Sequence, residues 1–448
     1  MGSLFGTDGI RGVAGEFITI ELAASVGRAA AAVLKEAGFE KPLVVVGKDT
    51  RISSDMLDCS ITSGLLSSGA DVISLGVMPT PAVAYLTVLY KAAAGIVISA
   101  SHNSFEHNGI KIFGGNGCKL PDELENRIED YVLGRREMPE HKAYGAIGRI
   151  LRPENDPHEE YVSHLLSAAE GRFSGLRVLV DCSNGAASFT APALFARLDL
   201  KADIIFASPD GININAECGS TQLNNLRRGV IEGGYDLGIA FDGDADRCLI
   251  IDEKGNTIDG DKIMGLTALH EKSRRCLPGD TIVATVMSNL GLHHFCREHG
   301  IRLICTSVGD RNVLETMLEG GYLVGGEQSG HLIFRRFATT GDGQLAALRF
   351  LSVLSESGLK ASGLGEKVPQ YPQEMVNIRV TGGNEEKARI MESDALRTEI
   401  EACECELNGN GRILVRPSGT EPLIRVMVEA ETTQKALYLA QRIANSLR

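Results

Sequence analysis

The stretch AGIVISASHNSFEHNGIKIF, residues 94–113, decides the fold, because an apolar run stops at a group of polar residues and then resumes. Residues 94–98 have the length and composition of a buried strand, and Ser101, His102 and Asn103 follow where that strand should end. In open α/β sheets, ligands bind beyond the carboxyl ends of the strands. The stretch therefore predicts an α/β sheet with Ser101 at a candidate site.

Three other stretches repeat this design of a buried strand that runs into a polar loop. They are PLVVVGKDTR (42–51), LRVLVDCSNGAAS (176–188) and DLGIAFDGDADR (236–247). Helical patterns lie between the strands, and one amphipathic face ends near Gly38 and contains Leu22, Val26, Ala29, Val33 and Leu34. Alternating strands and helices predict α/β layers, and the rhythm restarts about three times, which favours similar α/β units in series.

The pattern changes near residue 370, after GEKVPQYPQ. Strands are predicted at EMVNIRV (374–380) and within GRILVRPSGTEPLIRVMVEA (411–430). A terminal helix is predicted to follow, with one face made of Leu437, Ala440, Ala444 and Leu447. These elements predict a separate, smaller α+β domain.

Composition narrows the class of protein. A chain of 448 residues is long enough for about two to four domains, and 43% hydrophobic and 23% charged residues are typical of a soluble globular protein. No apolar run reaches the roughly 18 residues of a membrane span, and the start MGSLFGTDGI lacks a signal-peptide pattern. We expect a cytoplasmic location.

Net charge limits the possible binding partners, and the spacing of the cysteines bears on disulfides and zinc. A net charge of −13 argues against a nucleic acid, but a local basic cluster can still bind a small anion, because charges are screened over about 8 Å. Of the ten cysteines only Cys403 and Cys405 lie close together, and as alternate residues of a strand they would point to opposite faces. Free thiols are a better interpretation than disulfides or zinc.

The densest group of acidic residues is FDGDADRCLIID, in which Asp242, Asp244 and Asp246 alternate. Clustered carboxylates repel one another, so a cation usually holds them, and their hard oxygen atoms suit Mg²⁺ or Ca²⁺. The spacing mimics a calcium-binding EF-hand loop with Glu253 in its last position. Arg247, where that loop needs glycine, and the strand-like flanks oppose this alternative. We expect Mg²⁺, with a solvated acidic turn as the other interpretation.

Ser101, such a metal and Lys111 together would support phosphoryl transfer, because the metal neutralises charge and the lysine handles a proton or the phosphate charge. A Ser-His-Asp hydrolase is one alternative, but the adjacent His102 is poorly placed as a base and the G-x-S-x-G motif is absent. A helix cap is the other interpretation of Ser101.

Two loops offer contacts to a phosphate and a sugar. RPSGTEPLIR (416–425) presents hydroxyl groups, backbone amides and two arginines, with a solvated hairpin as the alternative. GGEQSGH (325–331) allows a ligand to approach closely, with a tight turn as the alternative. The glycine-framed FGTDGIRG (5–12) and VGDRNV (308–313) add Arg11 and Arg311. The Walker A motif is absent, which disfavours nucleotide hydrolysis.

These stretches, in this order along nearly the whole chain, resemble the α-D-phosphohexomutase superfamily, and most of all its amino-sugar branch. The resemblance implies a four-domain α/β architecture, with three similar α/β domains that have mixed sheets and a smaller C-terminal α+β domain, around a central cleft. The implied domains carry the serine, metal, sugar and phosphate loops in turn and span residues 1–153, 154–255, 256–368 and 369–448.

The resemblance also implies a role for each residue. Ser101 would be the serine that is phosphorylated, and one Mg²⁺ would be held by Ser101, Asp242, Asp244 and Asp246. The sugar would contact Glu327, Ser329, Gly309, Asp310 and Arg311. The phosphate that does not react would contact Arg416, Ser418, Gly419, Thr420 and Arg425. The residues close to the chemistry, none of them singled out as the proton carrier, would be Lys111, Arg11, Arg247 and His331.

The implied reaction interconverts glucosamine 6-phosphate and glucosamine 1-phosphate through hexosamine 1,6-bisphosphate, which is intermediate and activator, and feeds UDP-N-acetylglucosamine synthesis. Gln328 in the sugar loop favours amino sugars over the alternative, a phosphomannomutase/phosphoglucomutase. A serine-dependent sugar phosphatase and a non-catalytic sugar-phosphate sensor are alternatives of other classes. The expected partner is the small hexosamine phosphate, with no nucleic acid or membrane, and a homodimer stays open.

Two residues depart from the family pattern. Ser104 stands where a proline commonly follows Ser-His-Asn, which frees the backbone and could loosen the serine loop. Gln222 stands where relatives often have histidine. Neither change removes a predicted ligand.

Overall fold

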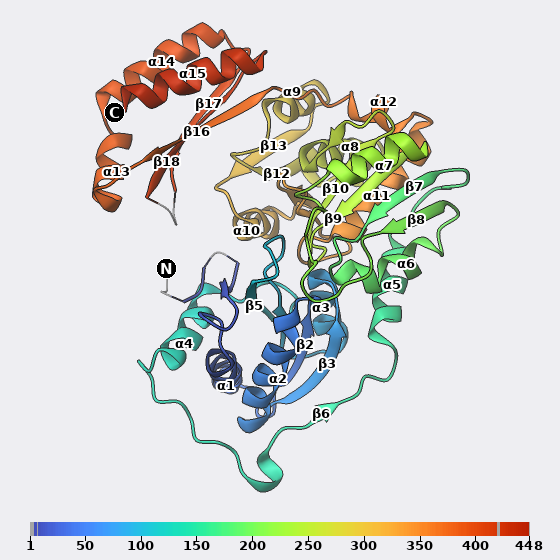
Figure 1. The fold of residues 1–448 in the computed structure, drawn as a ribbon, viewed down its shortest axis with the longest axis vertical. Coiled ribbons are helices and arrows are strands. Elements are labelled where there is room, and N and C mark those ends of the chain that lie inside the picture. Colours follow the sequence, from blue (N-terminus) through green and yellow to red (C-terminus); the bar gives the residue numbers. More distant parts are fainter. Residues whose placement is uncertain (1–3, 7, 419–421, 448) are drawn as a thin grey trace. The chain divides into compact units, whose positions relative to one another are not determined.

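The computed structural model of the chain describes residues 4–6, 8–418 and 422–447. The chain divides into two compact units, one made of residues 1–287 and 301–366 and the other of residues 288–300 and 367–448. The first unit contains three mixed sheets and the second contains one antiparallel sheet, which confirms the predicted fold class (Figure 1). Among the described helices, none combines the length and the apolarity that crossing a bilayer requires.

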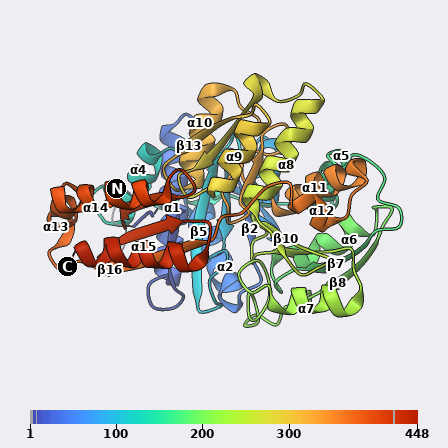
Figure 2. The same cartoon turned by 90° about the horizontal axis from the view of Figure 1, so that it is seen from above.

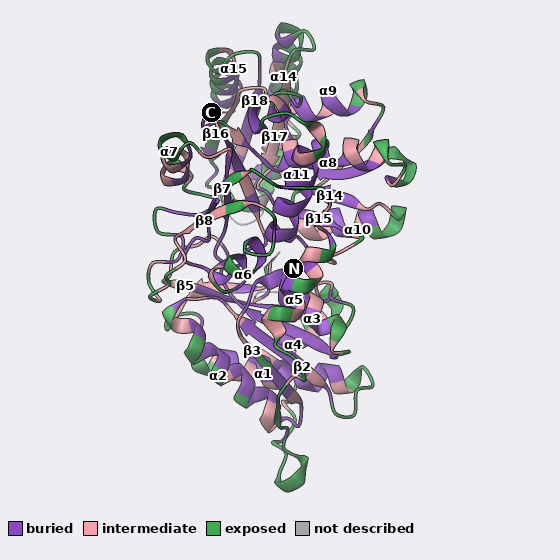
Figure 3. Ribbon diagram, turned by 90° about the vertical axis from the view of Figure 1, so that its right-hand side faces the viewer, coloured by how far each residue is buried: buried purple, intermediate pink, exposed green. Residues whose placement is uncertain are grey.

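The first sheet positions the serine loop. Its six strands follow the order β1-β5-β4-β2-β3-β6, and β5 runs antiparallel to both of its neighbours. Strand β4 is buried throughout, as the sequence predicts, and Figure 3 shows the burial of β2 beside it. The strands are β1 (Ile10–Val13), β2 (Leu43–Lys48), β3 (Asp71–Val77), β4 (Ala94–Ile98), β5 (His107–Gly114) and β6 (Ile150–Leu151). The helices are α1 (Ile20–Glu36), α2 (Ile52–Ser67), α3 (Thr80–Leu89) and α4 (Asp122–Val132).

The second sheet carries the acidic loop between two antiparallel strands, β9 and β10, so the strand-like flanks that oppose an EF-hand are confirmed. The order is β11-β10-β9-β7-β8, and Figure 2 shows α6 and α7 on either side of the sheet. The strands are β7 (Arg177–Asp181), β8 (Lys201–Ile205), β9 (Leu237–Phe241), β10 (Cys248–Asp252) and β11 (Thr257–Ile258). The helices are α5 (Pro157–Ser167), α6 (Ala191–Phe195) and α7 (Asn224–Gly233).

The third sheet has four strands in the order β13-β12-β14-β15, and the sugar loop connects the antiparallel pair β14 and β15. The strands are β12 (Thr281–Thr285), β13 (Arg302–Thr306), β14 (Val324–Gly326) and β15 (Leu332–Phe334). The helices are α8 (Gly260–Ser273), α10 (Asp310–Gly320), α11 (Gly343–Ser357) and α12 (Ala361–Gly365). The loops that follow β4, β9 and β14 therefore each belong to a different sheet.

Residues 367–448 of the second unit form the smaller α+β domain that the C-terminal pattern predicts, and the unit also includes residues 288–300. Its antiparallel sheet has the order β16-β18-β17, and its core lies between this sheet and the helices. The strands are β16 (Gln373–Arg379), β17 (Arg412–Pro417) and β18 (Leu423–Glu429). The helices are α9 (Leu290–Glu298), α13 (Gly383–Met391), α14 (Asp394–Leu407) and α15 (Thr433–Ser446).

Two details of the second unit differ from the sequence prediction. Leu437 is 38% exposed, because the buried face of α15 consists of Ala436, Leu439, Ala440, Ile443 and Ala444. The predicted face was therefore turned by one position at its start. Cys403 and Cys405 belong to helix α14 and not to a strand, yet they still point apart, with Cys403 buried and Cys405 exposed. All ten cysteines are free thiols.

Helices α1 and α2 pack so closely that glycine is required at their crossing. A Cβ atom on Gly64 would overlap the carbonyl oxygen of Ala24, and one on Gly27 would overlap that of Ile61. The backbones of the two helices meet where neither has a side chain. Because α2 begins at Ile52, directly after a residue that contacts the serine loop, this contact also helps to place the site.

We predict that Gly64→Ala lowers the melting temperature, because overpacking a buried contact costs about 1–3 kcal/mol. This exceeds the gain of up to about 1 kcal/mol that alanine brings to a helix. Gly363→Ala, in helix α12 with nothing within 4 Å of the new Cβ, is the matched control and should leave the melting temperature unchanged or higher. Equal melting temperatures for the two variants, measured by scanning calorimetry, would contradict the prediction.

Candidate active site

Ser101 lies three residues beyond the last residue of β4, at the start of a polar turn, and its side chain is almost fully buried. Its φ angle is 52°, in the left-handed region that few residues other than glycine adopt. The Ser101 amide donates to the hydroxyl of Ser99 at 2.9 Å, which supports this conformation. A strained, buried serine at a strand end is typical of a functional position and not of a helix cap.

Arg51 holds the serine loop in place. Its fully buried guanidinium donates to the backbone carbonyls of Ser101 and Asn103, both at 2.9 Å, and to those of Ser104 and His107. A salt bridge of 2.8 Å to Asp49 balances its charge. This clamp compensates for the backbone freedom that the sequence predicts at Ser104, because it fixes the carbonyl group of that residue.

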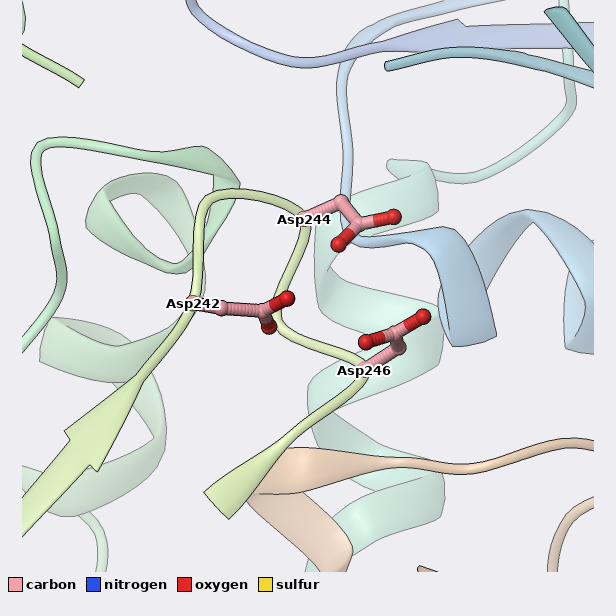
Figure 4. A group of neighbouring side chains, drawn as sticks. All are labelled: Asp242, Asp244 and Asp246. Atoms are coloured by element: carbon pink, nitrogen blue, oxygen red, sulfur yellow. The ribbon is translucent and has the colours of Figure 1, made fainter. Parts of the chain in front are cut away.

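The three aspartates of the acidic loop converge on one point. Figure 4 shows the carboxylates of Asp242, Asp244 and Asp246 directed toward one another, and one oxygen of each lies within 4.8 Å of the others. All three are buried. Burial and the neighbouring carboxylates raise the pKa of Asp242 well above its usual range. The Ser101 hydroxyl donates to Asp242 Oδ2 at 2.6 Å, so the predicted serine and the predicted metal ligands meet.

The donor set fits a small hard cation. In the described residues, Asp244 Oδ1 and Asp246 Oδ1 are buried oxygens without a hydrogen-bond partner. An unpaired buried carboxylate oxygen is costly, and Mg²⁺ prefers oxygen ligands of this kind. These residues could therefore hold Mg²⁺, and a solvated acidic turn is not compatible with their burial.

Lys111 is the main positive charge beside the three aspartates. Its ammonium group lies 2.9 Å from Asp244 Oδ2, 3.5 Å from Asp246 Oδ2 and 3.1 Å from Asp8 Oδ2. Burial acts to lower the pKa of Lys111, but the carboxylates of Asp244, Asp8 and Asp246 outweigh it and raise the pKa above its usual value. Lys111 therefore keeps its proton and acts as a fixed cation.

His331 and Arg247 contact the same acidic loop. His331 Nδ1 lies 3.5 Å from Asp246 Oδ2, and the Gly341 amide lies 3.1 Å from His331 Nε2. Burial acts to lower the pKa of His331, but the carboxylates of Asp246, Asp310 and Glu327 outweigh it and raise the pKa to about 9. The Arg247 amide donates to Asp242 Oδ1 at 3.2 Å. Arg247 and His331 also pair as an isolated β-bridge, which joins the acidic loop to the sugar loop.

His102 lies beside Ser101, and Arg11 joins the neighbouring charged network through Asp8. Arg11 pairs with Asp8, which in turn contacts Lys111. His102 Nδ1 lies 3.5 Å from Ser101 Oγ. The Asp242 carboxylate, which accepts the hydrogen bond of the Ser101 hydroxyl, lies closer, at 2.6 Å. Burial and the guanidinium groups of Arg247 and Arg11 lower the pKa of His102 to about 4. The geometry does not resemble a Ser-His-Asp triad, in which histidine is the close partner of serine.

The sugar loop follows β14 and is held by side-chain contacts with two neighbouring segments. Glu327 Oε1 accepts a hydrogen bond of 3.2 Å from the amide of Gly309, so the two predicted sugar-binding loops touch. Ser329 Oγ is buried and has no hydrogen-bond partner in the described part of the chain. Gln328 Nε2 donates to Asp259 Oδ2 at 3.1 Å, and Asp259 caps α8. The loop is therefore fixed to the start of α8.

Two of the predicted sugar-binding residues are engaged elsewhere. Arg311 donates to the carbonyl of Leu120 at 3.1 Å and to Glu125 at 3.0 Å, on the first domain. Asp310 lies 2.7 Å from the ammonium of Lys119 and 3.6 Å from His331 Nε2. Asp310 therefore belongs to the network around the acidic loop, and Arg311 does not.

The predicted phosphate loop lies in the second unit, between β17 and β18. Arg416 and Arg425 face each other directly across the two strands. Burial and the charge of Arg425 lower the pKa of Arg416. Two like charges in this position destabilise a sheet unless an anion lies between them. The Ser418 carbonyl accepts a hydrogen bond of 2.9 Å from Lys387, whereas Gly419 and Thr420 lie outside the described residues.

Sequence reasoning missed four residues that build the site. Asp8 and Lys119 link Lys111 to Asp310, Thr80 donates to Asp244, and Arg51 clamps the serine loop. Asp8 and Arg51 stand within the quoted stretches FGTDGIRG and PLVVVGKDTR, so a charged residue in a glycine-rich or strand-end loop was the available signal. Thr80 and Lys119 stand outside every quoted motif.

Comparison with known proteins defines the class. The sequence matches the four domain descriptions of phosphoglucomutase/phosphomannomutase, namely alpha/beta/alpha domain I at residues 2–138, domain II at 159–255, domain III at 259–371 and the C-terminal domain at 375–446. The chain therefore belongs to the phosphoglucomutase/phosphomannomutase family, whose members are phosphohexomutases.

Relatives within the family carry a more particular name. The chain is 51% identical over 446 residues to the phosphoglucosamine mutase of Caldanaerobacter subterraneus subsp. tengcongensis, covering 99% of this chain and 98% of that protein. It is 53% identical to the phosphoglucosamine mutase of Carboxydothermus hydrogenoformans, with 96% and 95% covered.

Two solved structures share the fold. One is a phosphoglucomutase/phosphomannomutase family protein of Burkholderia thailandensis (TM-score 0.83, 24% identity, 100% and 98% covered). The other is the Aspergillus fumigatus N-acetylphosphoglucosamine mutase with GlcNAc-6P and magnesium (TM-score 0.71, 17% identity, 100% and 96% covered).

We predict that Arg51→Lys loosens the serine loop, because an ammonium group cannot reproduce the planar fork that reaches several carbonyls. Each buried carbonyl left unpaired costs about 1–3 kcal/mol, so the melting temperature should fall and amide exchange within residues 99–108 should accelerate. Arg28→Lys is the control, since Arg28 donates to one exposed carbonyl, that of Pro139. Wild-type exchange protection of residues 99–108 in Arg51→Lys, measured by mass spectrometry, would contradict the role of Arg51.

Proposed function

We propose that this chain is a phosphoglucosamine mutase, which interconverts glucosamine 6-phosphate and glucosamine 1-phosphate through a phosphoserine at position 101. The observation that carries the proposal is the hydrogen bond of 2.6 Å between Ser101 Oγ and Asp242 in the centre of the acidic cluster. The full-length relatives named phosphoglucosamine mutase support the choice of substrate. The proposed domains span residues 1–153, 154–255, 256–368 and 369–448.

The reaction begins with phosphorylated Ser101. The free hydroxyl of the bound sugar monophosphate attacks phosphorus and the bond from phosphorus to Ser101 Oγ breaks. The sugar hydroxyl loses one proton and Ser101 Oγ gains one, so the serine is left as a neutral hydroxyl. The product is hexosamine 1,6-bisphosphate. After it has turned around, Ser101 Oγ attacks its other phosphate, and the sugar leaves as the isomeric monophosphate. No ATP is consumed, because one phosphoryl group leaves and one returns.

The residues around Ser101 supply charge and orientation. Lys111 places its ammonium among the carboxylates, where it can balance a phosphoryl group carried by Ser101. Arg11, Arg247 and His331 stand around the same point as further candidates to contact the transferring group or to move the proton. Asp242, Asp244 and Asp246, with the phosphate on Ser101, would hold one Mg²⁺, which when bound neutralises charge on the phosphoryl group.

Two loops would bind the rest of the substrate. Glu327, Ser329, Gly309 and Asp310 would surround the sugar, a proposal supported by the contact of Glu327 with Gly309 and by the buried hydroxyl of Ser329, which has no partner among the described residues. Arg311 would join them after it releases Glu125. The phosphate that does not react would be bound by Arg416, Ser418, Gly419, Thr420 and Arg425. The facing charges of Arg416 and Arg425 support this assignment.

Gln328 would influence the choice of sugar indirectly. Its amide donates to the buried Asp259 and thereby fixes the loop on which Glu327 and Ser329 stand. A side chain without a donor at this position would leave Asp259 with one hydrogen bond fewer. The preference for amino sugars would therefore come from where the loop holds Glu327 and Ser329.

We predict that Ser101→Ala lowers mutase turnover by several orders of magnitude, because the variant has no side-chain oxygen at position 101 to accept the phosphoryl group. Ser104→Ala, an exposed serine of the same loop, is the control and should keep wild-type turnover. Both variants are compared by a coupled assay of sugar 1-phosphate formation and by their melting temperatures. A folded Ser101→Ala variant with near-normal turnover would refute the phosphoserine mechanism.

We predict that the enzyme, primed with trace bisphosphate, converts glucosamine 6-phosphate faster than glucose 6-phosphate or mannose 6-phosphate. Release of inorganic phosphate should stay far below turnover, because the phosphoryl group returns to the enzyme. The measurement is a parallel assay of the three sugars with phosphate detection. Equal or faster conversion of glucose or mannose phosphate would favour a phosphoglucomutase/phosphomannomutase, and stoichiometric phosphate release would favour a phosphatase.

A further inference from the structure

The oxygens of Asp244 have unequal surroundings. Asp244 Oδ2 accepts hydrogen bonds from Thr80 Oγ1 at 2.6 Å and from Lys111 Nζ at 2.9 Å. Asp244 Oδ1 is buried and has no hydrogen-bond partner in the described residues. One oxygen of this carboxylate is therefore committed to the protein, and the other remains for a cation in the cluster that Figure 4 shows.

Thr80 grips Asp244 at two points. Besides the hydroxyl, the Thr80 amide donates to the backbone carbonyl of Asp244 at 3.0 Å. Thr80 is the first residue of α3 and is 2% exposed. Solvent is therefore excluded from its contact with Asp244, and the helix fixes the position of Thr80. The backbone bond fixes the position of the residue, and the hydroxyl bond fixes the rotation of its carboxylate.

Lys111 alone cannot set this rotation. Its ammonium group is shared among Asp8, Asp244 and Asp246, and an ammonium on a flexible stem has no preferred direction. The Thr80 hydroxyl donates to Asp244 Oδ2 at 2.6 Å, a shorter distance than the 2.9 Å from Lys111 Nζ. The hydroxyl therefore decides which of the two oxygens turns toward the cation.

We propose that Thr80 is a positioning residue for the metal site, and that its hydroxyl holds Asp244 with Oδ1 turned toward the cation. The proposal rests on the proposed function, in which Asp244 is a Mg²⁺ ligand. It adds a link between domains, because Thr80 stands on the domain of Ser101 and Asp244 stands on the next one. The residue that aligns the ligand is thus carried by the domain that carries the serine.

The test measures equilibrium Mg²⁺ binding by calorimetry on the full chain, independently of turnover. Thr80→Val keeps the shape of the side chain and removes the hydroxyl, whereas Thr80→Ser keeps the hydroxyl. The matched control is Thr87→Val, because Thr87 is a fully buried threonine of the same helix whose hydroxyl donates to the Val83 carbonyl at 2.7 Å. Asp244→Asn serves as the reference for a damaged ligand.

We expect Thr80→Val to weaken Mg²⁺ binding about 10-fold to 100-fold, the usual cost of losing a partner of a metal ligand. Thr80→Ser should restore affinity to within about threefold of the wild type, and Thr87→Val should bind Mg²⁺ normally even where its melting temperature falls. Thr80→Ala replaces Thr80→Val in the same comparison where valine prevents folding.

Wild-type affinity in Thr80→Val, or equally weak binding in Thr80→Val and Thr80→Ser, would overturn the role of the hydroxyl while leaving the mutase mechanism in place. Equal weakening in Thr87→Val would show a general effect of stability and would also overturn it. A wild-type chain that turns over substrate but does not bind Mg²⁺ would overturn the metal role in the proposed function, and this inference with it.

Discussion

The active centre depends on holding three carboxylates together away from water. Asp242, Asp244 and Asp246 repel one another, and burial strengthens that repulsion because the dielectric screening of water is lost. The cluster is tolerated because its oxygens meet donors: Ser101 and the Arg247 amide at Asp242, and Lys111 at the other two. The oxygens that lack a donor are those left for a cation.

This arrangement requires three parts of the chain to meet at one point. The serine loop follows β4 of the first sheet, the acidic loop follows β9 of the second, and His331 stands beside β15 of the third. The serine loop is held within its own domain by the Arg51 clamp, whereas the acidic loop is also held by Thr80 of the serine domain. The hydrogen bond from Ser101 to Asp242 is therefore one of several contacts that hold the two loops against each other.

The sequence predicted the site where local pattern carried the information. Ser101 and Asp242 stand at the ends of apolar runs, where α/β folds bind ligands, so each was a candidate site residue. Their meeting across two different sheets was implied only by the family resemblance. Thr80 belongs to no recognisable motif. Its role depends on Asp244, which lies 164 residues farther along the chain. Contacts of this kind depend on how the domains pack, and no local pattern encodes them.

The fold, too, was predictable only where local sequence pattern determines it. The period of α1 gave its buried face because the helix packs along its length, with Ala29 and Val33 buried as expected. For α15 the predicted buried face was wrong by one position. It included Leu437, which is exposed, and left out Leu439 and Ile443, which pack into the core beside the sheet. Helical period limits the choice of face, and the position of the sheet decides it.

The most direct test of this account is the location of the transferred phosphoryl group. The purified chain, incubated with hexosamine 1,6-bisphosphate, is digested and analysed by mass spectrometry for phosphorylated peptides. We expect one phosphoryl group on Ser101, lost again when sugar monophosphate is added, and none on the neighbouring Ser99 or Ser104. An enzyme that turns over substrate while Ser101 stays unmodified, or that carries the phosphoryl group on another residue, would contradict it.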